Sequence, residues 1–315
     1  MTESPVVDLV GVGLNATDTL ISLPVFPERG SKMEYSAARV MPGGQTASTV
    51  VACQTWGLTT RYVGKLGSDD AARIHRDAFA HVGVEDHLLL VDDCPSPQSI
   101  IIVDAGGERT VLCQRHERMG LRPEELKREW IVNARALHVD GFDTEAATLA
   151  ATWAYEAGIP VIADLDELYP GVDDLIALVD YLIVSRDFPC RLMKERDLET
   201  ALRRMHLRYG CKLTAATLGQ DGVLAYDGEN YVQRATYRVP TVDTTGAGDI
   251  FHAGFIYGLS QRWPLERTLD FSCAAAARNC MEQGARGGIR PVAEVEEMMR
   301  TVERYELTED LSSSK

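Results

Sequence analysis

No stretch of about 20 consecutive apolar residues occurs in the sequence, and the chain lacks a cationic start followed by a long apolar segment. These absences predict neither insertion into a membrane nor export. Runs of basic residues are also missing, and 32 Lys and Arg face 47 Asp and Glu, which gives a formal net charge of −15. Nucleic acid and anionic membranes are therefore not expected as partners.

Cysteine is scattered: the seven residues include no Cys-x-x-Cys pair, and no histidine cluster lies beside them. This distribution argues against a disulfide framework and against a structural zinc site. It fits a reducing compartment, so we expect a cytoplasmic protein. Internal repeats and linkers are not evident either, so nothing in the sequence marks a boundary between separate domains.

The patterning of the chain predicts an α/β fold. A β-rich run at 5–13 opens the sequence, and from residue 121 onward helical and strand patterns alternate. The expected strands 136–140, 159–163 and 180–184 are apolar on both sides, which is typical of a parallel sheet covered by helices on both faces. We therefore predict a doubly wound, mostly parallel sheet. The expected helices are 45–56, 69–82, 122–133, 143–157, 171–179, 264–282 and 291–305.

Two further β-leaning regions do not fit the alternating pattern. One covers 20–40, and the other is a hairpin with strands 98–104 and 109–114 around glycines at 106 and 107. Together they predict a small second sheet that stands off the main one.

The most informative stretch is VDTTGAGDIF, residues 242–251, because a polar run meets two glycines and then an apolar helix. A helix that opens on Gly246-Ala247-Gly248 presents unpaired amide groups and the positive end of its dipole, which suits an anion. Asp249 would repel that anion unless it acts as a base beside a transferring phosphoryl group. The alternative is a plain strand-to-helix turn in which Asp249 only stabilises the helix dipole.

The stretch DTTGAGDIF, followed by Gly254, resembles the C-terminal signature of the ribokinase-like (PfkB) carbohydrate kinases. In that family the Gly-Ala-Gly amides form an anion hole for the γ-phosphate, and the following aspartate deprotonates the sugar hydroxyl. The resemblance implies that Gly246, Ala247 and Gly248 are the anion hole and that Asp249 is the catalytic base.

A second resemblance lies in MPGGQTAS, residues 41–48, which is similar to the Gly-Gly-Asn-x-x-Asn signature of the same family. It implies that Gly43, Gly44, Gln45 and Ser48 contact the sugar. Gln45 and Ser48 replace both asparagines of the pattern, so the contacts to the sugar hydroxyls must be rearranged.

The family also assigns residues of the small sheet, with strands at about 15–40 and 97–116, to a lid. Asp18 would hold sugar hydroxyls, the alternative being a turn carboxylate. Arg109 resembles an arginine that reaches the substrate in ketohexokinase-like members, although a solvated hairpin arginine or a role for Arg115 is also open. Such lids close over the sugar and often pair two subunits, which implies a homodimer.

Candidate metal ligands lie where strands end. Asp140 is one strand-end carboxylate, and the pair Asp164 and Asp166 could orient water bound to Mg²⁺ or simply cap the next helix. The segment 185–188 stands where the family has Asn-x-x-Glu, but here the first position is Ser185 and the last is Phe188. Asp187, one position early, is a candidate replacement for the lost carboxylate.

The resemblance assigns the remaining residues to ATP and to a monovalent cation such as K⁺. ATP would be contacted by Ser185, by Thr217, Gly219 and Gly222 of a Thr-x-Gly-x-x-Gly turn, by Cys273 on an alanine-rich helix, and by Gly287 in the loop that completes the adenine pocket. Asp243 and Thr245 would bind the cation.

We therefore expect residues 1–305 to form a single ribokinase-like domain with a polar tail at 306–315, acting as an ATP- and Mg²⁺-dependent sugar kinase. A ketose is favoured, because the signatures look closest to ketohexokinase-like and sulfofructose-kinase-like enzymes. The alternatives are a nucleoside kinase, a phosphosugar kinase, and a catalytically silent protein that binds a sugar or a nucleotide.

Overall fold

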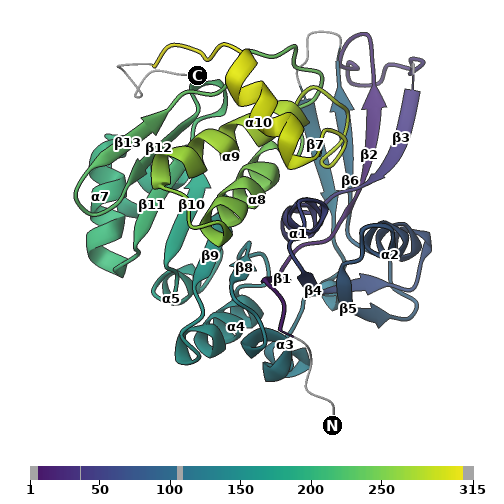
Figure 1. Cartoon of the computed structure of the whole chain (residues 1–315). Helices are drawn as coiled ribbons and strands as arrows, with labels where there is room; N and C mark the ends of the chain where they lie inside the picture. Colours follow the sequence, from purple (N-terminus) through teal and green to yellow (C-terminus); the bar gives the residue numbers. More distant parts are fainter. Residues whose placement is uncertain (1–5, 36, 105–108, 308–315) are drawn as a thin grey trace.

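The computed structural model describes residues 6–35, 37–104 and 109–307, with Arg109 described by its backbone alone. A large sheet occupies the centre of the molecule, and a small sheet stands at its side (Figure 1). In these residues the large sheet has nine strands. In spatial order they are β13 (Tyr231–Arg234), β12 (Val223–Tyr226), β11 (Leu213–Thr217), β10 (Tyr181–Ser185), β9 (Val161–Leu165), β8 (Leu137–Val139), β1 (Leu9–Val12), β4 (Thr60–Gly67) and β5 (Glu85–Val91).

The large sheet is mostly parallel, as predicted. Strands from β11 to β5 all run in one direction, whereas β12 runs the opposite way and pairs antiparallel with both β11 and the edge strand β13. The chain starts in the middle with β1, moves one way to β4 and β5, and later moves the other way from β8 to β13. The strand order therefore reverses between β1 and β8, and crevices at such reversal points are where open α/β sheets bind ligands.

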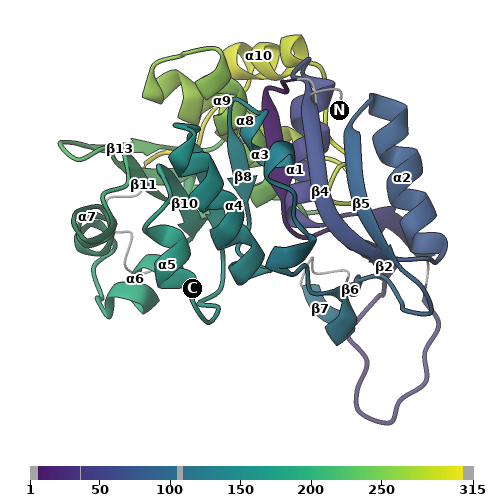
Figure 2. The same cartoon turned by 90° about the horizontal axis from the view of Figure 1, so that it is seen from below.

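Helices cover both faces of the large sheet (Figure 2). One layer contains α1 (Gln45–Thr55), α2 (Asp70–Val82), α8 (Ala247–Ser260), α9 (Leu265–Asn279) and α10 (Val292–Thr301), and the other contains α3 (Arg128–Val132), α4 (Thr144–Glu156), α5 (Val172–Ile176), α6 (Phe188–Met193) and α7 (Leu198–Tyr209). Along β9, Val161 and Ala163 pack into one apolar layer while Ile162 packs into the other. Burial on both sides explains why these strands are apolar throughout.

The small sheet has the order β3 (Ala37–Pro42), β2 (Thr17–Ser22), β6 (Gln98–Val103) and β7 (Arg109–Gln114). The β6–β7 hairpin pairs antiparallel as predicted, although the turn 105–108 lies outside the described residues. The prediction for 20–40 was too broad, because residues 23–35 project from the body without strand structure (Figure 2). A parallel ladder between β2 and β6 joins the two halves of this sheet.

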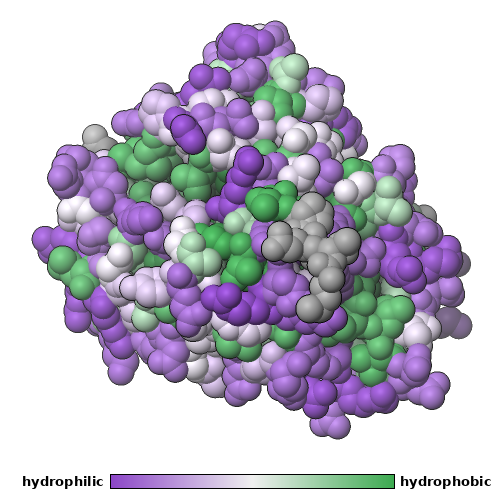
Figure 3. Space-filling view, turned by 60° about the horizontal axis from the view of Figure 1, so that its bottom comes forward, coloured by the Kyte–Doolittle hydropathy of each residue, from purple (hydrophilic) through white to green (hydrophobic). Residues whose placement is uncertain are grey.

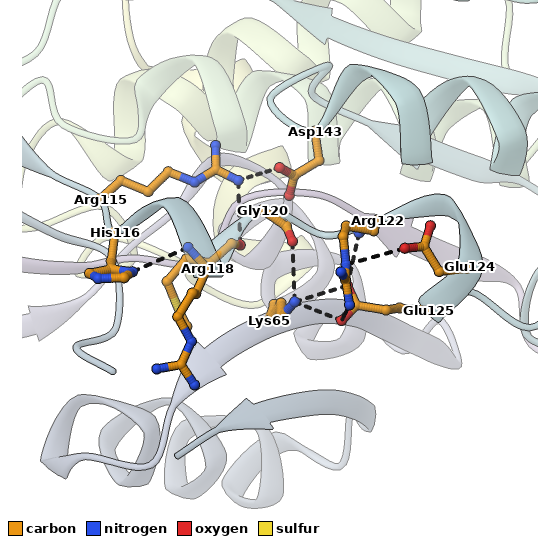
Figure 4. Close-up of polar contacts among 10 residues, drawn as sticks. Lys65, Arg115, His116, Arg118, Gly120, Arg122, Glu124, Glu125 and Asp143 are labelled. Carbon is orange, nitrogen blue, oxygen red and sulfur yellow. Dashed lines mark hydrogen bonds and ion pairs between the residues drawn. The ribbon is translucent and has the colours of Figure 1, made fainter. Parts of the chain in front are cut away.

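The predicted helix 122–133 is wrong over most of its length. The chain forms a 3₁₀ turn, η2 (Pro123–Glu125), runs extended through Leu126 and Lys127, and then forms the short α3. Glu125 causes the break, because its carboxylate accepts hydrogen bonds from the Arg122 amide (2.9 Å) and from Lys65 Nζ (2.7 Å) and so closes the turn (Figure 4). The predicted helix 171–179 is likewise only the short α5.

Several elements were not predicted at all, among them β4, β5, α6 and α7. For α7 the sequence carried a usable signal, since Leu198, Ala201, Leu202 and Met205 are buried at helical spacing. The surface is largely hydrophilic with smaller apolar patches on the face that Figure 3 shows. Among the helices of the described ranges, none combines the length and the apolar character that crossing a bilayer would require.

Phe188 shows why its motif departs from the family pattern. Its side chain is fully buried in the apolar layer under β10, where a glutamate would be costly. We expect Phe188→Ala to lower the free energy of unfolding by about 3–5 kcal/mol and Phe188→Leu to lower it by only about 1–2 kcal/mol, both measured by urea unfolding. A Phe188→Glu protein that stayed folded and bound Mg²⁺ more tightly would contradict this account.

Candidate active site

The turn before α8 has the geometry of an anion site. Gly246 is left-handed (φ 76°) and packs so closely on Ala285 that a Cβ would collide with its carbonyl. Ala247 N–H donates to the Thr244 carbonyl (3.2 Å), whereas the amides of Gly246 and Gly248 have no backbone acceptor within the described part of the chain. Two of the three predicted amides are thus free to bind an anion at the positive end of the helix.

Asp249 follows in the first turn of α8 and faces a cavity of about 320 Å³. The cavity is bounded by the ends of the central strands, the start of α8 and the inner face of the small sheet. Residues lining it include Leu14, Asp18, Gly44, Gln45, Ser99, Ile101, Val111, Cys113, Phe142, Asp166, Tyr169, Thr245, Gly246, Asp249 and Ala285. The small sheet therefore covers the cavity as a lid.

Burial raises the pKa of Asp249 well above its ordinary value. The nearby Asp164 carboxylate raises this pKa further, while His252 and Arg286 oppose the shift. A carboxylate with a raised pKa is a stronger base than an exposed one, provided that it is ionised at the working pH. The carboxylate can therefore accept a proton from a hydroxyl held in the cavity.

On the sugar side, the predicted residues come together only in part. Asp18, Gly44 and Gln45 line the cavity, and Gly43 lies directly against the Asp18 carboxylate. Ser48 does not reach the cavity, because it is fully buried and its Oγ accepts a hydrogen bond from Arg286 Nε (3.1 Å).

The carboxylates predicted for Mg²⁺ are dispersed. Asp166 lines the cavity and accepts a hydrogen bond from Gln45 Nε2 (3.2 Å), Asp164 is buried 3.4 Å from His252 Nδ1, and Asp187 is exposed at the start of α6. Burial, and then the Asp166 and Asp140 carboxylates, raise the pKa of Asp164. Across the described ranges, no group of three or more His, Cys, Asp or Glu residues is placed to hold a metal ion.

Both arginines of the lid hairpin were candidates for contact with the substrate. The side chain of Arg109 lies outside the described residues. Arg115 stacks on Phe142, with its Cζ 3.9 Å from the ring centroid, and pairs with Asp143 (Figure 4). Phe142 and Tyr169 meet edge to face and form an aromatic wall of the cavity. Arg115 is therefore behind this wall rather than on the cavity lining.

The residues predicted to contact ATP lie in two places. Ser185 and Thr217 are paired at the adjacent ends of β10 and β11, and the turn after β11 places Gly219 and Gly222 at positive φ. A Cβ on Gly222 would collide with the Arg234 carbonyl, so glycine is required there. Cys273 is apart from them, because its thiol is buried between α9 and β13, 4.0 Å from the same carbonyl.

The residues predicted to bind a monovalent cation take part in hydrogen bonds that connect two loops. Asp243 accepts hydrogen bonds from Thr245 N–H (2.9 Å) and Gly284 N–H (2.8 Å), and the Thr245 carbonyl accepts one from Asn279 Nδ2 (3.2 Å). Gly287 lies farther along the second loop and is exposed. Thr245 Oγ1 is buried and has no partner among the described residues.

Three further residues shape the site: Asp140 was noted from the sequence only as a strand-end carboxylate, and His252 and Arg286 were given no role. Asp140 accepts hydrogen bonds from Leu14 N–H (2.6 Å), Thr46 Oγ1 (2.8 Å) and Phe142 N–H (3.0 Å), so it fixes three segments of the cavity. His252 contacts the carbonyls of Gly248 and Ile183, and Arg286 reaches Ser48. Of His252 and Arg286, only His252, three residues after Asp249, carried a local signal.

A model of the pfkB family carbohydrate kinases matches residues 1–291, and the chain belongs to this family. It is 32% identical over 238 residues to the aminoimidazole riboside kinase of Salmonella typhimurium, covering 70% of this chain and 74% of that one. It is 24% identical to the ribokinase of Haemophilus influenzae, covering 89% and 94%.

Solved structures agree on the fold. A putative ribokinase from Agrobacterium tumefaciens superposes with a TM-score of 0.86 at 27% identity, covering 93% of this chain and 97% of that one. Arabidopsis thaliana ribokinase, complexed with ribose and ATP, gives a TM-score of 0.82 at 23% identity over 94% and 99%. The protein is a kinase of the sugar and nucleoside type with a ribokinase-like fold.

The burial of Asp18 has a consequence for stability. Burial raises the pKa of Asp18 to about 6, with Arg286 opposing the shift. Because the folded protein holds this proton more tightly than the unfolded chain, stability falls as the pH rises from about 4 to about 6, and the loss is complete above that window. We expect Asp18→Asn to stabilise the ligand-free protein at pH 8 by up to about 3 kcal/mol and to have little effect at pH 4. Thermal unfolding at both pH values checks this, and equal Tm changes at the two would contradict it.

Proposed function

We propose that the protein transfers the γ-phosphoryl group of ATP to a hydroxyl of a small neutral sugar or riboside, with Asp249 as the general base. The observation that carries the proposal is the position of Asp249. It lies at the positive end of α8, between the free amides of Gly246 and Gly248 and the sugar-side residue Asp18. A carboxylate beside an anion site is of use to a kinase, whereas a protein that only binds nucleotide gains nothing from the repulsion.

The steps follow from this geometry. Asp249 takes the proton from the acceptor hydroxyl, and the resulting alkoxide attacks the γ-phosphorus as the bond to the ADP oxygen breaks. The amides of Gly246 and Gly248 hold the charge that develops on the phosphoryl oxygens. The lid keeps water away, so that ATP is not hydrolysed instead.

Mg²⁺ and K⁺ are the ions that we propose for this reaction. Mg²⁺ would neutralise phosphate charge, and the dispersed positions of Asp164, Asp166 and Asp187 favour a metal held mainly by the phosphates and by water. For K⁺, the buried Thr245 Oγ1 beside Asp243 is the supporting feature. An E. coli putative ribokinase II of the same fold was solved with ATP and Mg²⁺.

The charge of the cavity favours an uncharged substrate. Asp18, Asp166 and Asp249 face it, and among the side chains that the structure describes neither lysine nor arginine lines it. A phosphosugar would therefore meet repulsion. The aromatic wall of Phe142 and Tyr169 favours a riboside with a flat base as the second candidate beside a ketose, and the relative from Salmonella is an aminoimidazole riboside kinase.

Coupled release of ADP from Mg-ATP tests the proposal over a panel of ketoses, aldoses, ribosides and sugar phosphates. We expect turnover of a neutral member and a loss of about 10² or more in kcat for Asp249→Asn, which is the scale of general-base catalysis. Asp70→Asn is the matched control, because Asp70 also lies in the first helical turn but is exposed on α2. Binding of ATP without turnover of any panel member would support the silent binder instead.

The outer face of the lid supports a homodimer. Val40, Thr19, Ile100 and Leu112 are directly paired across the four strands and so share one face. Three of them are apolar and between 39% and 56% exposed. An unpartnered apolar row of this kind is typical of a protein interface.

We expect Leu112→Lys to shift the protein from dimer to monomer in sedimentation velocity. Leu207→Lys is the control, since Leu207 is an exposed leucine on α7, away from the lid. A wild-type protein that sediments as a monomer would overturn the dimer proposal.

Location in the cytoplasm stays a prediction.

A further inference from the structure

Arg286 lies in the loop after α9, and its side chain points inward behind the sugar-side turn. Nη2–H donates to the Gly43 carbonyl (2.6 Å), and Nε–H donates to Ser48 Oγ (3.1 Å). Nη1 is buried and has no partner in the described part of the chain. A guanidinium in such a place is costly unless its charge is used, because burial penalises an ion.

The first use of this side chain is mechanical, at the hinge of the lid. Strand β3 ends at Pro42, and Gly43 and Gly44 connect it to α1. The Gly43 amide donates to the Ala16 carbonyl (2.8 Å), and Gly43 lies directly against the Asp18 carboxylate. By holding the Gly43 carbonyl, Arg286 fixes the turn that supports Asp18.

The loop that carries Arg286 also backs the phosphate side. Ala285, its neighbour, is in contact with Gly246 at the anion-binding turn, and Gly284 N–H donates to Asp243 in the same turn. Asn279 closes the arrangement by binding both the Ala285 carbonyl and the Gly288 amide. Arg286 therefore links the two turns between which the phosphoryl group would pass.

The second use is electrostatic. The Arg286 guanidinium lowers the pKa of both Asp18 and Asp249, against the larger effect of burial on each. Asp243 raises the pKa of Asp18, while Asp164 raises and His252 lowers that of Asp249. Tyr62 of β4 and His75 of α2 also interact electrostatically with the guanidinium. Burial lowers the pKa of His75 to about 3, so this histidine is uncharged at neutral pH.

We propose that Arg286 is a positioning residue of the reaction: it holds the sugar-side turn in register with the anion-binding turn and places one positive charge behind both Asp18 and Asp249. The inference rests on the proposed kinase function. The proposal also explains why serine replaces the asparagine of the family pattern at position 48, because the short side chain of Ser48 leaves room for the guanidinium and accepts a hydrogen bond from it.

The test compares Arg286→Gln, Arg286→Lys and a control, Arg290→Gln. Arg290 lies near the same loop and binds the Gly287 and Ile289 carbonyls, but its charge pairs with Glu282, away from the cavity. The pH profile of kcat/KM is measured with the panel sugar that the wild type turns over fastest.

For Arg286→Gln we expect the acid limb of the profile to move up by about one pH unit, which is a tenfold change in proton affinity, and KM for the sugar to rise about tenfold. Arg286→Lys keeps the charge but loses one of the two hydrogen bonds. The acid limb of its pH profile should therefore stay in place, while KM for the sugar rises. Arg290→Gln matches the wild type. The proposal would be contradicted if the acid limb of the Arg286→Gln profile did not move, or if the limb of Arg290→Gln moved by the same amount.

Thermal unfolding of the ligand-free protein tests the role of Arg286 independently of the proposed kinase activity. Without Arg286 the folded-state pKa values of Asp18 and Asp249 rise further, so stability keeps falling with pH through a higher window. The Tm difference between the wild type and Arg286→Gln in the ligand-free protein should therefore grow between pH 6 and pH 8. A constant difference overturns the charge role even if no sugar is turned over.

If Arg286→Gln does not fold, Ser48→Ala decides the mechanical part. It removes only the acceptor of Nε, so we expect KM for the sugar to rise about threefold, on the scale of one lost hydrogen bond, with the acid limb unmoved. An unchanged KM would contradict the link between Ser48 and Arg286.

Discussion

Repulsion among buried carboxylates is the constraint around which the site is organised. Asp18, Asp166 and Asp249 face one cavity, Asp164 is buried beside His252 on α8, and burial raises the pKa of each of the four. Without nearby positive charge, these buried carboxylates would either destabilise the fold or stay protonated. The compensation comes from α8, through its positive end and His252, and from Arg286 in the loop after α9.

Much of the framework could be predicted from the sequence, because its signals are local. The turn and helix around Gly246 follow from two glycines beside an apolar run, although the strand end expected just before them is not formed. The mostly parallel sheet follows from strands that are apolar on both faces. The placement of Asp249 beside the free amides of Gly246 and Gly248 follows from the same few residues. In contrast, the break at Leu126 depends on Lys65, which is about 60 residues away and gives no local sign of its role.

The finer parts of the site were not predictable for the same reason. Ser48 looks like a weakened sugar ligand in the sequence, but its hydroxyl is taken by Arg286, 238 residues later. Phe188 looks like a lost metal ligand, but it is a core residue. Each departure from the family pattern acquires its meaning from a partner brought close by the fold, so a motif that differs in sequence is not evidence of a missing function.

The parallel ladder between β2 and β6 has a consequence for how the lid can move. The two strands are adjacent in space, but the chain between them runs through α1, β4, α2 and β5 of the main body. Neither hairpin can peel away alone without breaking that ladder. Opening must therefore be a rigid rotation of the whole four-stranded sheet about the short connections at its ends. The two hairpins of the lid can pair only after the main sheet has brought them together, so the lid must form late in folding.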